Sequence, residues 1–127
     1  MSLGIDVVDI ERFRAALARA PSLQRRLFSD AERGYSAAKP DPVMHLAGTL
    51  AAKEAVIKAL RLGRLVEWAG RIEVTRDADG VPVASVELDD ACIGVEISIS
   101  HERHTAVAVA SRPPQIRGGS DGFSTGS

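Results

Sequence analysis

A carboxylate interrupts an apolar row in the middle of the chain. Apolar side chains recur in steps of three and four at Leu46, Leu50 and Ile57, the spacing of one face of an α-helix. The step of four from Leu50 falls on Glu54. An unpaired charge on a buried helix face costs about 3–5 kcal/mol, so Glu54 needs a cation. Either Lys58, one helical turn further on, or a bound metal ion supplies it.

A second carboxylate, Asp6, lies in a short apolar stretch near the N-terminus. Two carboxylates with no histidine or cysteine nearby in sequence suit a hard, oxygen-seeking cation such as Mg²⁺. Lys53 and Lys58 would then face the negative charge of a phosphorylated substrate. The non-catalytic interpretation makes Asp6 a helix cap and Glu54 the partner of Lys58. Spacing alone leaves both interpretations open.

The elements that position these side chains change type near residue 70. The first part predicts a strand over residues 3–8 and several helices, of which the longest begins at Pro42 with Asp41 as its N-cap and ends near Leu62, before Gly63. A capping box, Ser29 to Glu32, begins an earlier helix. The second part alternates apolar and polar residues, which predicts antiparallel strands over residues 71–76, 81–88, 93–100 and 105–110. The sequence therefore predicts an α+β fold, with an N-terminal strand and one long central helix packed on a small antiparallel sheet.

Length and composition predict one domain in residues 1–112 and a disordered tail in residues 113–127. The 127 residues are 45% hydrophobic and carry a formal net charge of −1, which excludes a nucleic-acid binder driven by overall charge. The single cysteine, Cys92, excludes an internal disulfide and a cysteine-built zinc site. No apolar run predicts a membrane span or a signal peptide, so we expect a cytoplasmic protein.

Positive charge is concentrated in residues 12–33, which hold six arginines against two acidic residues. The simpler interpretation is a solvated helix face. The alternative is a docking surface for an acidic partner, attracted by complementary charge.

Three segments together resemble one known family. Residues 4–13 (GIDVVDIERF), residues 46–60 (LAGTLAAKEAVIKAL) and residues 97–101 (ISISH) are similar to motifs of the holo-acyl-carrier-protein synthases, the short 4′-phosphopantetheinyl transferases. They occur in that family's order and near its spacing, over roughly residues 3–111.

The resemblance implies transfer of 4′-phosphopantetheine from coenzyme A to a serine of an apo acyl carrier protein, leaving 3′,5′-ADP. It implies that Asp6 and Glu54 hold Mg²⁺, with Mn²⁺ as an alternative. It further implies that Lys58 contacts the diphosphate and that His101, with Ser100, lines the nucleotide part of the site. Asp6, Glu54 and Lys58 are thus the expected catalytic residues, in a homotrimer with sites between subunits.

The resemblance also gives the arginine-rich segment a partner. Acyl carrier proteins are strongly acidic, and Arg12 and Arg19 fall where the family's carrier-binding arginines lie. The carrier is expected to be of the fatty-acid or the polyketide type.

Two departures from the family pattern keep a second interpretation open. Thr49 stands where many members have an arginine that touches the 3′-phosphate of coenzyme A, and the turn at Gly63 is shorter than usual. The alternative is therefore a catalytically weak relative that acts as a carrier-binding or scaffold subunit. Binding of coenzyme A with Mg²⁺ separates the two interpretations.

Overall fold

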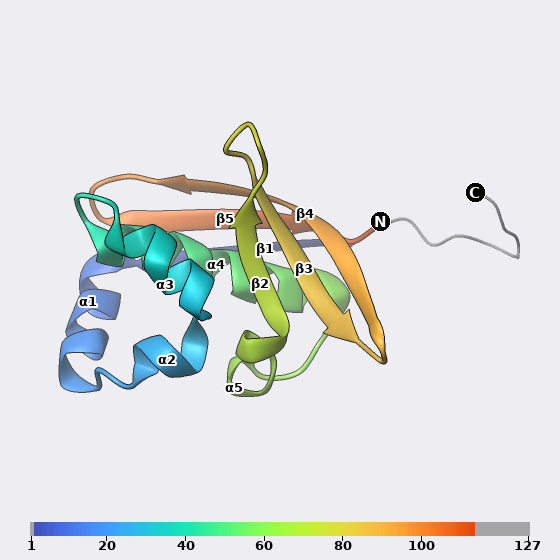
Figure 1. Cartoon of the computed structure of the whole chain (residues 1–127), viewed down its shortest axis with the longest axis horizontal. Helices are drawn as coiled ribbons and strands as arrows, with labels where there is room; N and C mark the ends of the chain where they lie inside the picture. Colours follow the sequence, from blue (N-terminus) through green and yellow to red (C-terminus); the bar gives the residue numbers. More distant parts are fainter. Residues whose placement is uncertain (1, 114–127) are drawn as a thin grey trace, which may run out of the picture.

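A five-stranded antiparallel sheet packs on one long helix, and the short helices α1, α2 and α3 gather at one end of the domain (Figure 1). The computed structural model describes residues 2–113. The strand order is β1-β5-β4-β3-β2, and every neighbouring pair is antiparallel. The elements in chain order are β1 (Leu3–Asp9), α1 (Ile10–Arg19), α2 (Leu23–Leu27), α3 (Asp30–Ala37), α4 (Pro42–Leu60), α5 (Leu65–Trp68), the 3₁₀ helix η1 (Ala69–Arg71), β2 (Ile72–Arg76), β3 (Pro82–Leu88), β4 (Ala91–His101) and β5 (Thr105–Ser111). The predicted α+β class is confirmed; the predicted tail lies outside the described residues, except for Pro113.

The helix starts follow the expected capping chemistry, but the end of α4 does not. Ser29 and Glu32 form the reciprocal capping box of α3, and Asp41 caps α4. The predicted end of the long helix near Leu62, before Gly63, is wrong, because α4 ends at Leu60. Arg61 adopts the left-handed conformation (φ 56°), and the amide of Leu62 donates to the carbonyl of Ile57, which satisfies the last turn.

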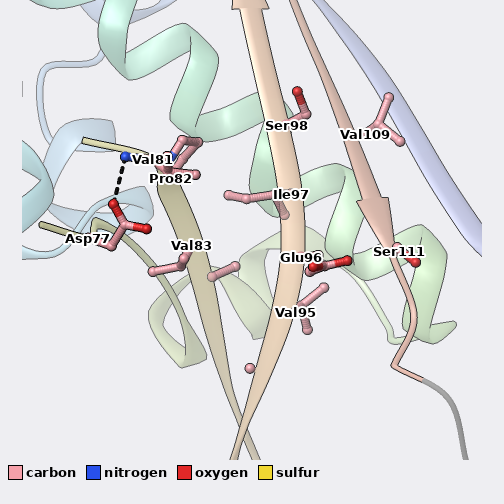
Figure 2. Close-up of a pocket in the computed structure, with 12 residues that line it drawn as sticks. Asp77, Val81, Pro82, Val83, Val95, Glu96, Ile97, Ser98, Val109 and Ser111 are labelled. Carbon is pink, nitrogen blue, oxygen red and sulfur yellow. Dashed lines mark hydrogen bonds between the residues drawn. The ribbon is translucent and has the colours of Figure 1, made fainter. Parts of the chain in front are cut away.

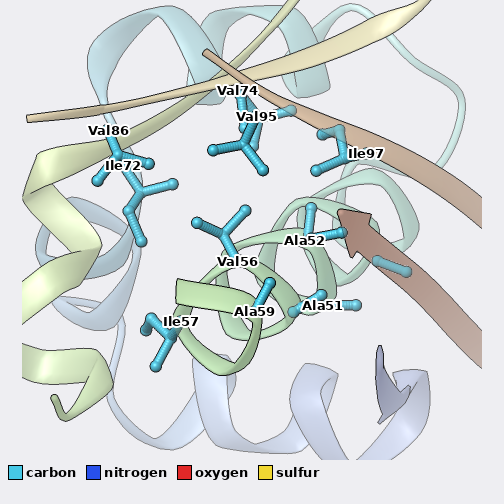
Figure 3. Packing of buried hydrophobic residues seen from close by; sticks show 14 residues of the cluster. Ala51, Ala52, Val56, Ile57, Ala59, Ile72, Val74, Val86, Val95 and Ile97 are labelled. Atoms are coloured by element: carbon cyan, nitrogen blue, oxygen red, sulfur yellow. The ribbon is translucent and has the colours of Figure 1, made fainter. Parts of the chain in front are cut away.

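Helix α4 is the core of the domain. The sequence predicted a single buried row that includes Leu50 and Glu54, but both side chains are only half-buried. Instead Ala51, Ala55 and Val56 are fully buried, because the sheet covers one side of the helix and the short helices cover part of the other. Figure 3 shows this packing of α4 against residues of β2, β3 and β4. Within residues 2–113, no helix combines the length and apolarity needed to span a bilayer.

The strand β1 approaches the backbone of α4 so closely that position 4 must be glycine. A Cβ built on Gly4 would lie 1.9 Å from the carbonyl oxygen of Ala55 and 2.7 Å from the amide nitrogen of Ala59. This contact places Asp6, two residues further along the strand and on the same face, against the helix.

We therefore expect Gly4→Ala to destabilise the fold by more than about 3 kcal/mol, beyond the usual cost of overpacking, because backbone atoms must move. Gly34→Ala is the matched control: it lies within α3 with nothing near its added methyl, so it should stabilise by about 0.5–1 kcal/mol. Urea unfolding followed by circular dichroism measures both changes. A Gly4→Ala protein as stable as the parent would show that β1 does not pack on α4 in this way.

Candidate active site

Asp6, Glu54 and Lys58 meet where β1 crosses α4. The amine of Lys58 lies 3.1 Å from Oδ1 of Asp6 and donates to the carbonyl of Ile5 at 2.9 Å. Lys58 therefore pairs with Asp6 rather than with Glu54. Asp6 is not a helix cap either, because Asp9 performs that role for α1. Neither non-catalytic interpretation of these carboxylates is retained.

Glu54 lies in an environment that disfavours its negative charge. Burial raises the pKa of the Glu54 carboxyl, the nearby charge of Asp6 raises it further, and Lys58 partly opposes the shift. Two neighbouring carboxylates that repel each other favour the binding of a cation.

The number and type of possible ligands, two carboxylates, favour some metal ions over others. Among residues 2–113 no cluster of three or more histidine, cysteine, aspartate or glutamate side chains could enclose a metal. Asp6 and Glu54 alone fit Mg²⁺, which commonly takes one or two carboxylates and completes its shell with water and substrate phosphate. They do not fit a closed zinc site, which needs four protein ligands.

The two carboxylates share a cleft with the arginines of α1. The cleft has a volume of about 410 Å³, and its lining includes Asp6, Glu54, Asp9, Arg12 and Arg19. Arg12 and Arg19 are seven residues apart, two helical turns, so they lie on one exposed face of α1. The structure thus brings together the residues expected to hold the metal and those expected to bind the carrier.

Arg14, on the same helix, forms ion pairs with carboxylates of this chain. Its guanidinium binds both carboxylate oxygens of Asp41, at 3.2 and 2.9 Å, and also pairs with Glu11. This contact holds the pKa of Asp41 below its usual range and joins α1 to the start of α4. Only part of the basic segment is therefore free to meet a partner.

Lys53 does not face a substrate, which corrects the expectation from its sequence position. Its side chain is fully buried and lies 2.9 Å from Oε1 of Glu32. The amine also donates to the carbonyls of Leu27 and Ala69, so its three hydrogens all have partners. Burial lowers the pKa of Lys53, while the Glu32 carboxylate opposes the shift. Lys53 is a structural residue.

His101 and Ser100, expected to act together, point to opposite faces of β4. Ser100 is exposed on the outer face of the sheet, whereas His101 turns toward α4. There the ring of His101 meets that of His45 edge to face, with centroids 5.0 Å apart. The strand alternation therefore rules out a joint contact of Ser100 and His101 with one group from the same side.

Thr49, also expected at the nucleotide, has no free proton to donate. Its side chain is buried, and its hydroxyl donates to the carbonyl of His45 at 3.1 Å. Thr49 therefore shapes this region but cannot supply a donor to a phosphate without breaking that bond.

The residues expected at the metal (Asp6 and Glu54) and Thr49, expected at the nucleotide, lie on different sides of α4. Glu54 lines the cleft formed with β1 and α1, and Thr49 lines a separate hollow with Tyr35 of α3 and Arg76 of β2. Five residues along a helix correspond to a rotation of about 140°. The Asp6–Glu54–Lys58 group and the region of Thr49 and His101 therefore do not open into one cavity of this chain.

Known proteins with similar sequences and structures define the class. Residues 2–110 match the family described as the 4′-phosphopantetheinyl transferase superfamily. The chain is 42% identical over 118 residues to the holo-[acyl-carrier-protein] synthase of Chlorobaculum tepidum, an alignment that covers 91% of this chain and 100% of that protein. It is 39% identical over 113 residues to the holo-[acyl-carrier-protein] synthase of Leifsonia xyli, covering 84% of this chain and 90% of that protein.

Solved structures agree with the sequence comparison. The holo-[acyl-carrier-protein] synthase of Helicobacter pylori in complex with coenzyme A superposes with a TM-score of 0.75 at 27% identity, covering 86% of this chain and 97% of that chain. The holo-(acyl-carrier-protein) synthase of Bacillus anthracis in complex with CoA (3′,5′-ADP) gives a TM-score of 0.71 at 29% identity, covering 86% and 92%. This chain therefore belongs to the 4′-phosphopantetheinyl transferase superfamily. Within that superfamily, the relatives named here are holo-acyl-carrier-protein synthases, so the resemblance of the three motifs is confirmed.

Proposed function

We propose that this chain is an enzyme that transfers the 4′-phosphopantetheine group of coenzyme A to a serine of an apo acyl carrier protein. The proposal rests on one cleft that is lined by Asp6, Glu54, Arg12 and Arg19. In this cleft the two carboxylates proposed to bind a cation lie beside the two arginines proposed to bind the carrier. The serine oxygen forms a bond to the β-phosphorus, and the bond from that phosphorus to the bridging oxygen of the diphosphate breaks. The products are the holo carrier protein and 3′,5′-ADP, and the serine proton leaves to solvent or to a carboxylate of the cleft.

Asp6 and Glu54 in the cleft, and Lys58 beside Asp6, have separate tasks in this reaction. Asp6 and Glu54 would hold Mg²⁺, or Mn²⁺, which when bound neutralises phosphate charge and polarises the phosphoryl oxygens. Lys58, held over Asp6 by the carbonyl of Ile5, is placed to donate to the departing phosphate oxygen. The nucleophile belongs to the carrier, so the chain needs none of its own.

The exposed arginines of α1 supply the contact with the carrier. Complementary charge mainly steers association and sets partner choice, and exposed charges are screened over about 8–10 Å at physiological salt. Arg12 and Arg19, exposed on one face of α1, are therefore the proposed contact with the acidic carrier.

The double variant Arg12→Gln/Arg19→Gln should raise the Michaelis constant for the carrier by about tenfold or more at low salt, where exposed charges act most strongly. The Michaelis constant for coenzyme A should stay unchanged. The control Arg71→Gln removes an exposed arginine that stacks on Trp68, outside the cleft, and should change neither value. Equal effects of the double variant and the control would refute the docking face.

An apolar sheet face supports assembly into a homotrimer. Leu3, Ile5 and Val7 are 58–64% exposed on the side of β1 that faces away from α4. Large exposed apolar patches mark interaction surfaces. On the same sheet, Val83 and Val109 border a hollow of about 580 Å³ (Figure 2). Sedimentation equilibrium should give three times the chain mass, and a monomer at micromolar concentration would contradict the assembly.

The reaction itself is tested by its small product. Chromatography of a mixture of this chain, coenzyme A, Mg²⁺ and an apo carrier should show one 3′,5′-ADP per modified carrier, and none with EDTA. Carriers of the fatty-acid and polyketide types are tested in parallel, since both remain predictions, as does the cytoplasmic location. Binding of coenzyme A without product on any carrier would favour the carrier-binding or scaffold role instead.

A further inference from the structure

Helix α1 presents different residues on its different sides. Arg12 and Arg19 lie on the exposed side, which lines the cleft of Asp6 and Glu54. The buried side consists of three apolar residues, Ile10, Phe13 and Leu17. Arg14 follows Arg12 by two residues, a rotation of about 200°, so it lies on nearly the opposite side of the helix. Arg14 is therefore not part of the surface proposed to bind the carrier.

On its own side of α1, Arg14 forms an ion pair that joins this helix to the start of α4. Its Nη1 lies 3.2 Å from Oδ1 of Asp41, and its Nη2 lies 2.9 Å from Oδ2. Asp41 is also the N-cap of α4, since it accepts from the amide of Met44. The pair thus links the helix with the docking arginines directly to the helix that carries Glu54.

A bidentate pair restricts orientation more than apolar packing does. The planar guanidinium must align two nitrogens with two carboxylate oxygens, whereas burial of apolar surface is non-directional. A rotation of α1 about its own axis would break this alignment. The same rotation would move Arg12 and Arg19 relative to the carboxylates of the cleft.

The other contacts of α1 restrain its rotation less. At its first turn the amide of Ile10 donates to the carbonyl of His104 at 2.9 Å, a single bond at the end of the helix. Glu11 pairs only with Arg14, within α1 itself. Within residues 2–113, Arg14 is the one side chain of α1 that forms a hydrogen bond or ion pair with another element or its cap. The link to Asp41 is therefore the contact best placed to fix the rotation of the helix.

We propose that Arg14 and Asp41 are positioning residues for the transfer reaction, which set the orientation of α1 relative to the carboxylates of the cleft. The inference rests on the proposed function, in which Arg12 and Arg19 bind the carrier. A carrier bound to α1 moves with α1, so breaking the pair should displace the carrier serine and leave the attracting charges in place. A displacement of about 1 Å can cost about 100-fold in rate, so the loss should appear in kcat.

Asp41→Asn is the sharpest test, because asparagine keeps the N-cap of α4 but removes the charge and one acceptor oxygen. Its kcat for an apo carrier should fall by about tenfold or more, while the Michaelis constants for carrier and coenzyme A change by less than about threefold. Arg14→Lys should also lose most of the rate, since an ammonium group cannot form the two parallel bonds. The double variant Arg14→Gln/Asp41→Asn should be no slower than Asp41→Asn alone, because both changes remove one link.

Arg33→Gln is the matched control. The partner of Arg33 is Asp30, on the same helix, so this variant removes an arginine pair that joins no two elements and should keep the parent kcat. Urea unfolding separates positioning from stability. A pair that only stabilises the fold would lower the unfolding midpoint of Asp41→Asn and leave kcat unchanged.

Two outcomes would overturn the positioning role: an Asp41→Asn protein with the kcat of the parent, or a loss confined to the Michaelis constant for the carrier. If the parent chain itself transfers nothing, the proposed function fails, and hydrogen exchange decides separately whether the pair holds α1. Amides of residues 10–19 should then exchange faster in Asp41→Asn than in the parent, and Arg33→Gln should match the parent. Equal exchange in all three proteins would reject the link.

Discussion

Replacing Glu54 by glutamine is expected to cut phosphopantetheine transfer by about 10²–10³-fold or more, the usual scale for losing one group that stabilises transition-state charge. Glutamine keeps the size of the side chain but removes the charge that is proposed to hold a divalent cation beside Asp6. The exposed Glu87→Gln of β3 is the control and should transfer normally. A Glu54→Gln protein with full, metal-responsive activity would contradict the assignment of the metal site.

The same substitution should make the metal-free fold more stable. Because burial and Asp6 raise the pKa of Glu54 in the folded state, the folded chain at neutral pH carries an unfavourable charge that glutamine removes. Removing this unfavourable charge should therefore raise the Tm of the metal-free protein at neutral pH. The folded state binds this proton more tightly than the unfolded state, so the advantage of glutamine is full above the folded pKa and disappears below about pH 4. Calorimetry at pH 7.5 and pH 4 measures this, and a lower Tm for Glu54→Gln at pH 7.5 would show that Glu54 stabilises the fold.

Lys53→Met should destabilise the fold by about 3–5 kcal/mol, since it leaves Glu32 charged, buried and without its cation. The Lys53–Glu32 pair links five elements of the chain, namely α2, α3, α4, η1 and β2. Lys53 binds the carbonyls of Leu27 and Ala69, and Glu32 accepts from the amide of Val74. Removing one partner therefore loosens α4 from α2, α3 and β2 at the same time.

Lys58, the next lysine of α4 and five residues on, provides a matched control. Lys58 is 55% exposed, so Lys58→Met should cost only about 0–1 kcal/mol while it strongly reduces transfer. Lys53→Met should show the reverse, with a large loss of stability and near-normal activity in the fraction that remains folded. The double variant Lys53→Met/Glu32→Leu should recover much of the loss, because no buried charge then lacks a partner. A small effect of Lys53→Met on urea unfolding would contradict this account of the pair.

Local chemistry made much of the fold predictable. The capping box at Ser29, the Asp41 cap and the alternation along β2 to β5 depend only on neighbouring residues, and all of them are confirmed. The opposite orientations of Ser100 and His101 also follow from strand alternation. The expectation that both line the nucleotide part of the site stays a prediction.

Contacts between segments far apart in the sequence could not be predicted from the sequence. No residue near Lys53 in the sequence indicates that its partner is Glu32, on another helix. A lysine within a run of alanines does indicate a buried charge. The close approach of Gly4 to α4 and the meeting of Lys39 with Arg76 on Tyr35 likewise appear only in three dimensions. The family resemblance named Asp6 and Glu54 as the expected metal ligands, and the structure shows that Lys58 pairs with Asp6.

The transfer reaction is tested by the intact mass of an apo acyl carrier protein incubated with this chain, coenzyme A and Mg²⁺. We expect a gain of about 340 Da, one phosphopantetheine on one serine, which is lost when EDTA is present. An unchanged carrier mass across several carriers, under conditions where the chain binds coenzyme A, would contradict it.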